Sequence, residues 1–179
     1  ALAVGVCSRV IAKFVGTSLI RNPEEAFMAG LIHDIGKITQ DQFMHDDYVP
    51  VLELCRDKKM ALLEAERELL EFDHQHVGAY LAENWNLPSV LTAPIAFHNA
   101  PRAQKHDGTV YAMICVVHIA DALVRALDLG SGGDPFVPAI DPDCWNCLGL
   151  KKSHVEVIMN DTAIATDELS GIVLPGKVT

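Results

Sequence analysis

The feature that most constrains this chain is a set of ionisable residues placed on apolar helical segments. The segment GLIHDIGK, residues 30–37, sets His33 and Asp34 side by side at the end of an apolar run. Burying such groups is costly unless each finds a partner, and a metal ion suits imidazole and carboxylate together. The fold therefore has to bring other polar groups to this doublet.

The rest of the sequence predicts helices and shows no convincing strand alternation. Asn22 and Pro23 are typical of a helix start, and we expect this helix to end near Gly36, with His33 and Asp34 in its last turn. A connector is expected at Asp46, Asp47 and Pro50. Other helices are predicted in the opening segment 1–20, over 57–72 with its charges in solvent, over 74–85 after a cap at Asp73, from Pro88 to His98, over 109–129, and as two short helices after 140–143 and 150–153. The fold class is therefore all-α.

Charge and cysteine content exclude several classes of function. A net charge of −10 and a pI near 5.1 argue against contact with a long nucleic acid, whose binding requires Lys and Arg. A small phosphorylated ligand held by local cations remains compatible. Five irregularly spaced cysteines are typical of a reduced, cytoplasmic protein. Arg9 and Lys13 interrupt the opening apolar segment, so we expect neither a signal peptide nor membrane insertion.

Six ionisable residues lie on the apolar segments. One such residue alone would usually be satisfied by hydrogen bonds in the interior, but six on several helices favour a shared metal ion. Lys37 follows the doublet and has two interpretations, a contact to phosphate or a cap at the helix C-terminus. The six residues are His33, Asp34, His74, His98, His118 and Asp121.

The blocks AFMAGLIHDIGK, DHQHVGAYLAENWNLP, FHNAP and HIADALVRALDLGSGG occur in this order. Together they resemble the HD superfamily of metal-dependent phosphohydrolases, and most closely its HDOD branch of bacterial signalling proteins, relatives of the HD-GYP cyclic-di-GMP phosphodiesterases. The resemblance implies one helical bundle over residues 1–179, with the metal site in a core at about 1–130 and terminal helices at 131–179 packed on it. It also implies a helical amino-terminal half ahead of residue 1.

The resemblance assigns the metal ligands and shows two departures. His33, Asp34 and Asp121 match one ion's ligands, while His74 and His98 match those of a second. Cys7 stands where the family has its first histidine, and Asn99 breaks a histidine pair, so these two and His118 are secondary candidates. The implied cofactor is a divalent ion of the iron, manganese, zinc or nickel type. The residues at positions 7 and 99 are expected to weaken or abolish the binding of this ion.

Two functions follow from the resemblance. The first is a regulatory signal-transduction module with a degenerate metal site and no turnover, which acts on a protein partner or a fused signalling domain. The alternative is a metal-dependent phosphohydrolase or phosphodiesterase acting on a nucleotide or cyclic dinucleotide, with Asp34 and Lys37 as catalytic residues. Cys7 and Asn99 favour the first, because turnover depends on a complete ligand set.

Overall fold

The chain folds into ten α-helices over residues 1–173, which are the residues that this computed structural model describes. No strand occurs among those residues, so the all-α prediction is confirmed. The helices are α1 (Leu2–Ala12), α2 (Pro23–Ile32), α3 (Ile35–Phe43), α4 (His45–Lys58), α5 (Leu62–Leu70), α6 (His74–Asn84), α7 (Ser89–Phe97), α8 (Gly108–Ala126), α9 (Pro142–Cys147) and α10 (Lys152–Val173).

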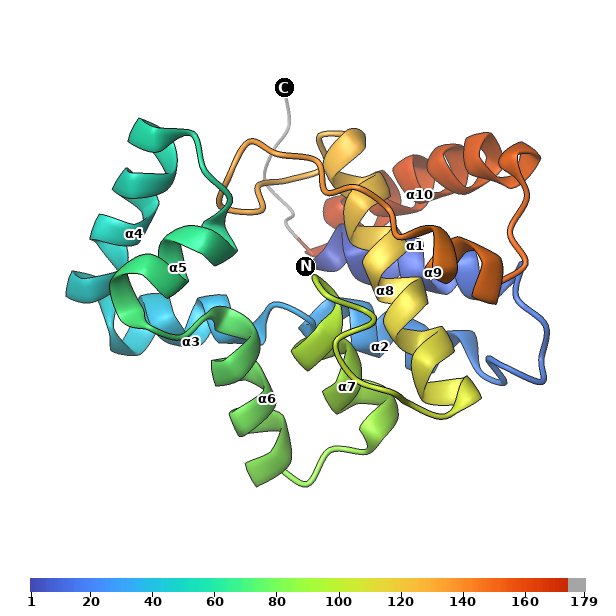
Figure 1. Cartoon of the computed structure of the whole chain (residues 1–179). Helices are drawn as coiled ribbons and strands as arrows, with labels where there is room; N and C mark the ends of the chain where they lie inside the picture. Colours follow the sequence, from blue (N-terminus) through green and yellow to red (C-terminus); the bar gives the residue numbers. More distant parts are fainter. Residues whose placement is uncertain (174–179) are drawn as a thin grey trace.

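Helix α8 lies in the larger of two helical groups and packs against α1, α2 and α7 (Figure 1). Val116, Val117 and Ile119 on this helix have no exposed surface. By length and composition α8 could cross a membrane, yet 78% of its most apolar window is buried in the fold. Its apolar character follows from its position in the core, where all of its faces meet other parts of the chain.

Helices α4 and α5 form a hairpin that stands apart from this group (Figure 1) and has its own small core around Tyr48, Val51 and Leu62. The predicted connector at Asp46 and Asp47 is wrong, because both residues lie in the first turn of α4. Negative charge is favourable at that end of a helix. The prediction of one helix over 57–72 is also wrong, because α4 ends at Lys58 and α5 begins at Leu62.

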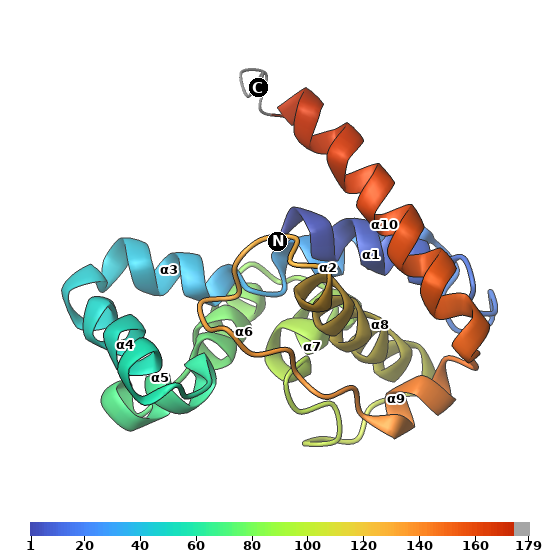
Figure 2. The same cartoon turned by 90° about the horizontal axis from the view of Figure 1, so that it is seen from above.

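The terminal helices cover one side of the larger group. Helix α9 packs on α8, and α10 packs on α1 through buried side chains that include Ile158 and Thr162. Figure 2 shows that the far end of α10 extends beyond the rest of the fold. The expectation of two short terminal helices is wrong for α10, which has 22 residues.

The helix that starts at Asn22 and Pro23 does not run to Gly36 as predicted. It ends at Ile32, and α3 begins three residues later, so His33 and Asp34 lie at a junction between two helices. Gly36 is in the first turn of α3, where a Cβ atom would lie 1.9 Å from the backbone oxygen of His74. This glycine lets α6 approach the junction and brings His74 next to the doublet.

We expect Gly36→Ala to destabilise the fold by about 2 kcal/mol or more, because the methyl group forces α3 and α6 apart. Chemical denaturation monitored by circular dichroism measures the effect. Gly171→Ala is the matched control, because a Cβ on that helical glycine meets nothing within 4 Å. The control should be neutral or gain up to about 1 kcal/mol through helix propensity. Equal stability of the two variants would contradict this account.

Candidate metal centre

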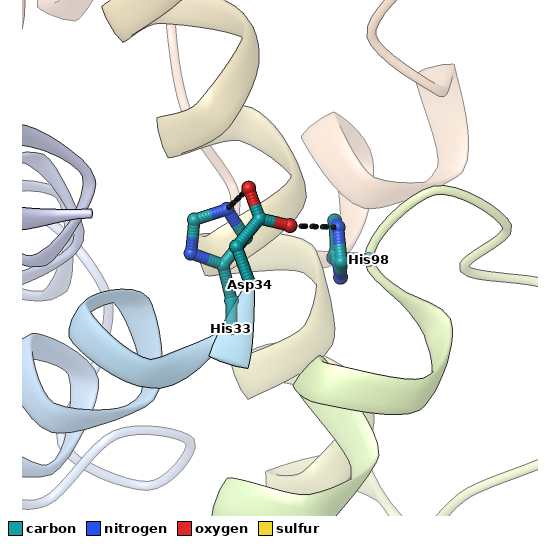
Figure 3. A group of neighbouring side chains, drawn as sticks. All are labelled: His33, Asp34 and His98. Atoms are coloured by element: carbon teal, nitrogen blue, oxygen red, sulfur yellow. Dashed lines mark ion pairs between the residues drawn. The ribbon is translucent and has the colours of Figure 1, made fainter. Parts of the chain in front are cut away.

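The His33–Asp34 doublet turns inward at the junction between α2 and α3. His33 is 2% exposed, and its Nδ1 donates to the backbone oxygen of Gly30 at 2.7 Å. Asp34 occupies the N-cap position of α3 but makes no capping hydrogen bond. Figure 3 shows its carboxylate between the rings of His33 and His98 instead.

Three imidazole rings from separate parts of the chain meet this carboxylate. His33 Nε2 lies 3.3 Å from Asp34 Oδ2, whereas the Nε2 atoms of His74 and His98 each lie 3.5 Å from Asp34 Oδ1. His74 opens α6 and His98 follows α7, so the fold joins residues that are far apart in sequence. The carboxylate thus has one oxygen facing His33 and the other facing His74 and His98.

Each of these rings is held by a hydrogen bond at its Nδ1 atom. The Nδ1 of His33 bonds the Gly30 carbonyl, that of His98 bonds the Pro94 carbonyl at 2.9 Å, and that of His74 bonds Glu66 Oε2 at 2.6 Å. Such anchoring fixes the orientation of each ring and directs its Nε2 atom inward, as in histidines that bind metals in proteins.

Asp121 on α8 brings a second carboxylate to the site. Its Oδ1 lies 3.8 Å from His33 Nε2, and its Oδ2 lies 3.9 Å from Arg125 Nη1. The structure therefore brings together all five of the main candidates and Asn99. The five are His33, Asp34, His74, His98 and Asp121.

Two secondary candidates are poorly placed to bind an ion. The thiol of Cys7 is fully buried, and burial raises its pKa to about 12, which opposes the thiolate form that binds metals. Both nitrogens of His118 are occupied, because Nδ1 donates to the His98 carbonyl at 2.7 Å and Nε2 accepts from the Asp141 amide at 2.9 Å. His118 thus holds the backbone at His98 rather than an ion.

The residues present suit a divalent ion. His33 Nε2 and Asp34 Oδ1 are buried and have no hydrogen-bond partner among the described residues. One ligand atom from each of His33, Asp34 and His98 lies within 4.8 Å of the other two. Imidazole and carboxylate donors of this kind suit zinc, iron or manganese, and the unpartnered atoms are the ones that an ion would satisfy.

The charges of the site support one another. Burial opposes a charged His33, but the carboxylates of Asp34 and Asp121 outweigh it and raise the pKa of His33 to about 9. Burial likewise opposes a charged Asp34, yet His33 and Lys37 hold the pKa of that carboxyl well below its usual range. Burial lowers the pKa of His98, which keeps this ring neutral and able to bind a metal.

Lys37 lies in the first turn of α3, so its interpretation as a C-terminal helix cap is wrong. Its Nζ is 2.8 Å from Asp34 Oδ2 and donates to the Gly132 carbonyl at 3.0 Å. The loop that carries Gly132 is also held by Asp134, which pairs with Arg125 and accepts from the Leu62 amide at 2.9 Å. Beside the site is a cavity of about 200 Å³, whose lining includes Lys37, His74, Asn99, Arg125 and Phe136.

Glu66 is a site residue that the sequence reasoning missed. The prediction that its charge lies in solvent is wrong, because it is fully buried and accepts from His74 Nδ1, from the His74 amide at 3.1 Å and from Tyr48 Oη at 3.2 Å. Its position four residues after Leu62 placed it on the apolar stripe of α5, and this spacing was the available signal. Glu66 links the α4–α5 hairpin to the metal centre.

The bundle and its clustered histidines and aspartates define a helical domain of the HD type. The family model described as "HDOD domain" matches residues 1–101, and the chain belongs to this family. An uncharacterised protein of Treponema pallidum (strain Nichols) is 25% identical over 105 residues. That match covers 58% of this chain and 20% of the Treponema protein.

Solved structures share the fold. An HDOD domain protein of unknown function from Geobacter sulfurreducens has a TM-score of 0.70 at 23% identity, over 96% of this chain and 57% of that one. A candidate signal transduction protein from Marinobacter aquaeolei VT8 has a TM-score of 0.77 at 19% identity, and the match covers 96% of this chain and 37% of that one. A candidate phosphohydrolase from Shewanella amazonensis SB2B has a TM-score of 0.57 at 20% identity, and the match covers 91% of this chain and 60% of that one. The chain thus spans only part of each of these proteins.

We expect Glu66→Ala to lower the free energy of unfolding by about 2 to 3 kcal/mol, because His74 and Tyr48 lose a buried partner. Thermal and chemical denaturation measure the loss. Glu64→Ala on the same helix is the matched control, since Glu64 is exposed and should change stability by less than about 0.5 kcal/mol. A small, equal effect of both substitutions would show that Glu66 does not support the site.

The affinity for a metal ion should keep rising at pH values well above the ordinary pKa of histidine. Without metal, His33 keeps its proton up to about pH 9, and an ion must displace that proton to bind Nε2. The apparent affinity for Mn²⁺ should therefore increase about tenfold per pH unit between pH 7 and 8.5. Equilibrium dialysis tests this, with the exposed His45→Gln as control. A plateau above pH 7 would indicate an ordinary histidine.

Proposed function

We propose that this protein is a regulatory signal-transduction module of the HDOD type, which binds a divalent ion at its HD-type centre without turning over a substrate. One observation carries the proposal: the cations that a hydrolase would direct at a phosphoester are bonded within the protein. Lys37 pairs with Asp34 and with the Gly132 carbonyl, and Arg125 pairs with Asp134. These bonds would have to break before either cation could meet a substrate.

The ligand set supports the same proposal. Cys7 offers a protonated thiol rather than an anionic ligand, since burial raises its pKa to about 12. Asn99 offers a neutral amide next to His74 and His98. An ion at this centre therefore has fewer strong ligands than a hydrolase needs to polarise a phosphoryl oxygen and activate water.

A metal-dependent phosphohydrolase or phosphodiesterase is the second candidate, and the cavity beside the centre favours it. Lys37 and Arg125 both line this space of about 200 Å³, which would suit a phosphoryl group of a nucleotide or cyclic dinucleotide. A bound ion would supply Lewis-acid polarisation of the phosphoryl oxygen. Lys37 would then have to break its ion pair with Asp34 and pair with the substrate instead.

The output of the module is also part of the proposal. We infer a protein partner or a fused signalling domain, with no contact to a long nucleic acid, because the chain carries a net charge of −10. Its five cysteines are free, which suits the reducing cytoplasm. A small phosphorylated ligand at the cavity would provide an input signal.

We expect the protein loaded with Mn²⁺ to leave cyclic-di-GMP and generic phosphodiesters intact, while its melting temperature rises by several degrees. Chromatography of the reaction mixture and thermal denaturation measure the two effects. His33→Ala and Asp34→Ala should abolish the thermal shift, because each removes a candidate ligand. His76→Ala is the control, since this exposed histidine lies outside the centre.

Turnover that disappears in both His33→Ala and Asp34→Ala would overturn the regulatory assignment and establish the second candidate. A thermal shift that survives in both variants would place the ion elsewhere on the protein.

A further inference from the structure

The side chain of Asn99 meets two of the inward-facing histidines at once. Its Nδ2 lies 3.3 Å from His74 Nε2 and 2.9 Å from His98 Nε2. Both rings are buried, and both are tied through Nδ1 to acceptors, the Glu66 carboxylate and the Pro94 carbonyl. In a neutral ring, a protonated Nδ1 leaves Nε2 with a lone pair.

These lone pairs determine which way the Asn99 amide points. An amide group has two N–H donors on nitrogen, and its oxygen can only accept. Two neighbouring lone pairs therefore bind the nitrogen side and repel the oxygen. One NH₂ group thus satisfies both the His74 and the His98 Nε2 atoms, with one hydrogen bond to each.

The two sides of the Asp34 carboxylate consequently differ. On one side, His33 Nε2 is buried without a hydrogen-bond partner in the described part of the chain, so an ion can bind it without displacing another side chain. On the other, Asp34 Oδ1 faces His74 and His98, whose lone pairs the amide already occupies. An ion that takes His33, Asp34 and His98 displaces one amide hydrogen bond. A second ion at His74 has to displace the whole amide.

We propose that Asn99 limits this centre to one divalent ion, because its amide occupies the place between His74 and His98 that a second ion would need. The inference rests on the proposed metal binding of the site and adds the number of ions. It also gives His74 a role as a hydrogen-bond acceptor for Asn99, held by Glu66. Asn99 is thus a specificity-determining residue for the metal centre.

The test counts bound Mn²⁺ on the full chain by equilibrium dialysis with elemental analysis. The wild type should hold one ion per chain, and Asn99→His should hold two, since imidazole replaces the competing donors with a ligand nitrogen. Asn99→Ala removes the donors without adding a ligand and should take up a second, weaker ion. Asn84→His adds a histidine at an exposed helix end and should stay at one ion.

Two ions of similar affinity in the wild type, or none, would overturn the inference. So would a single ion in both Asn99 variants, provided that either retains native circular dichroism. Incubating the same samples with cyclic-di-GMP separates this inference from the proposed function. If the wild type binds two ions and turns over no substrate, the limit set by Asn99 is refuted and the regulatory assignment stands. If it binds one ion and turns over substrate, the regulatory assignment is refuted and the limit set by Asn99 stands.

Discussion

The enclosure of the partly buried Asp34 carboxylate by three imidazole rings is the interaction on which the rest of this structure depends. A buried carboxylate is tolerated only where opposite charge and hydrogen-bond donors meet it. His33 and Lys37 provide that charge on one oxygen, while the other faces His74 and His98. Helix junctions and helix ends from across the bundle have to meet at this point, and the helices that carry them are placed accordingly.

This centre also connects parts of the fold that otherwise touch little. Glu66 and Tyr48 tie the α4–α5 hairpin to His74, and Asp134 ties the loop after α8 to Arg125 and to the start of α5. The binding or release of an ion at Asp34 would therefore affect the positions of both the hairpin and the loop. That coupling suits a signalling module, in which a bound ion or ligand has to alter a surface some distance away.

The sequence was most informative where one local rule decided the outcome. Caps at Asn22 and Asp73 mark the true starts of α2 and α6, because a side chain that accepts from the first turn needs no distant partner. It was least informative where packing competes with local preference. Pro50 suggested a connector but lies inside α4, and Glu66 looked like part of a solvated face but is enclosed. In both places tertiary contacts outweigh the local signal.

By itself, the sequence determined that the chain is all helical, that ionisable residues must share the interior, and which histidines and aspartates could do so. These properties follow from residue type and spacing along each helix. Only the tertiary structure decided that Lys37 pairs with Asp34, that Glu66 holds His74, and that Asn99 points its amide at two histidines. Those contacts join separate segments, and the distance between two side chains on different helices depends on how the helices pack.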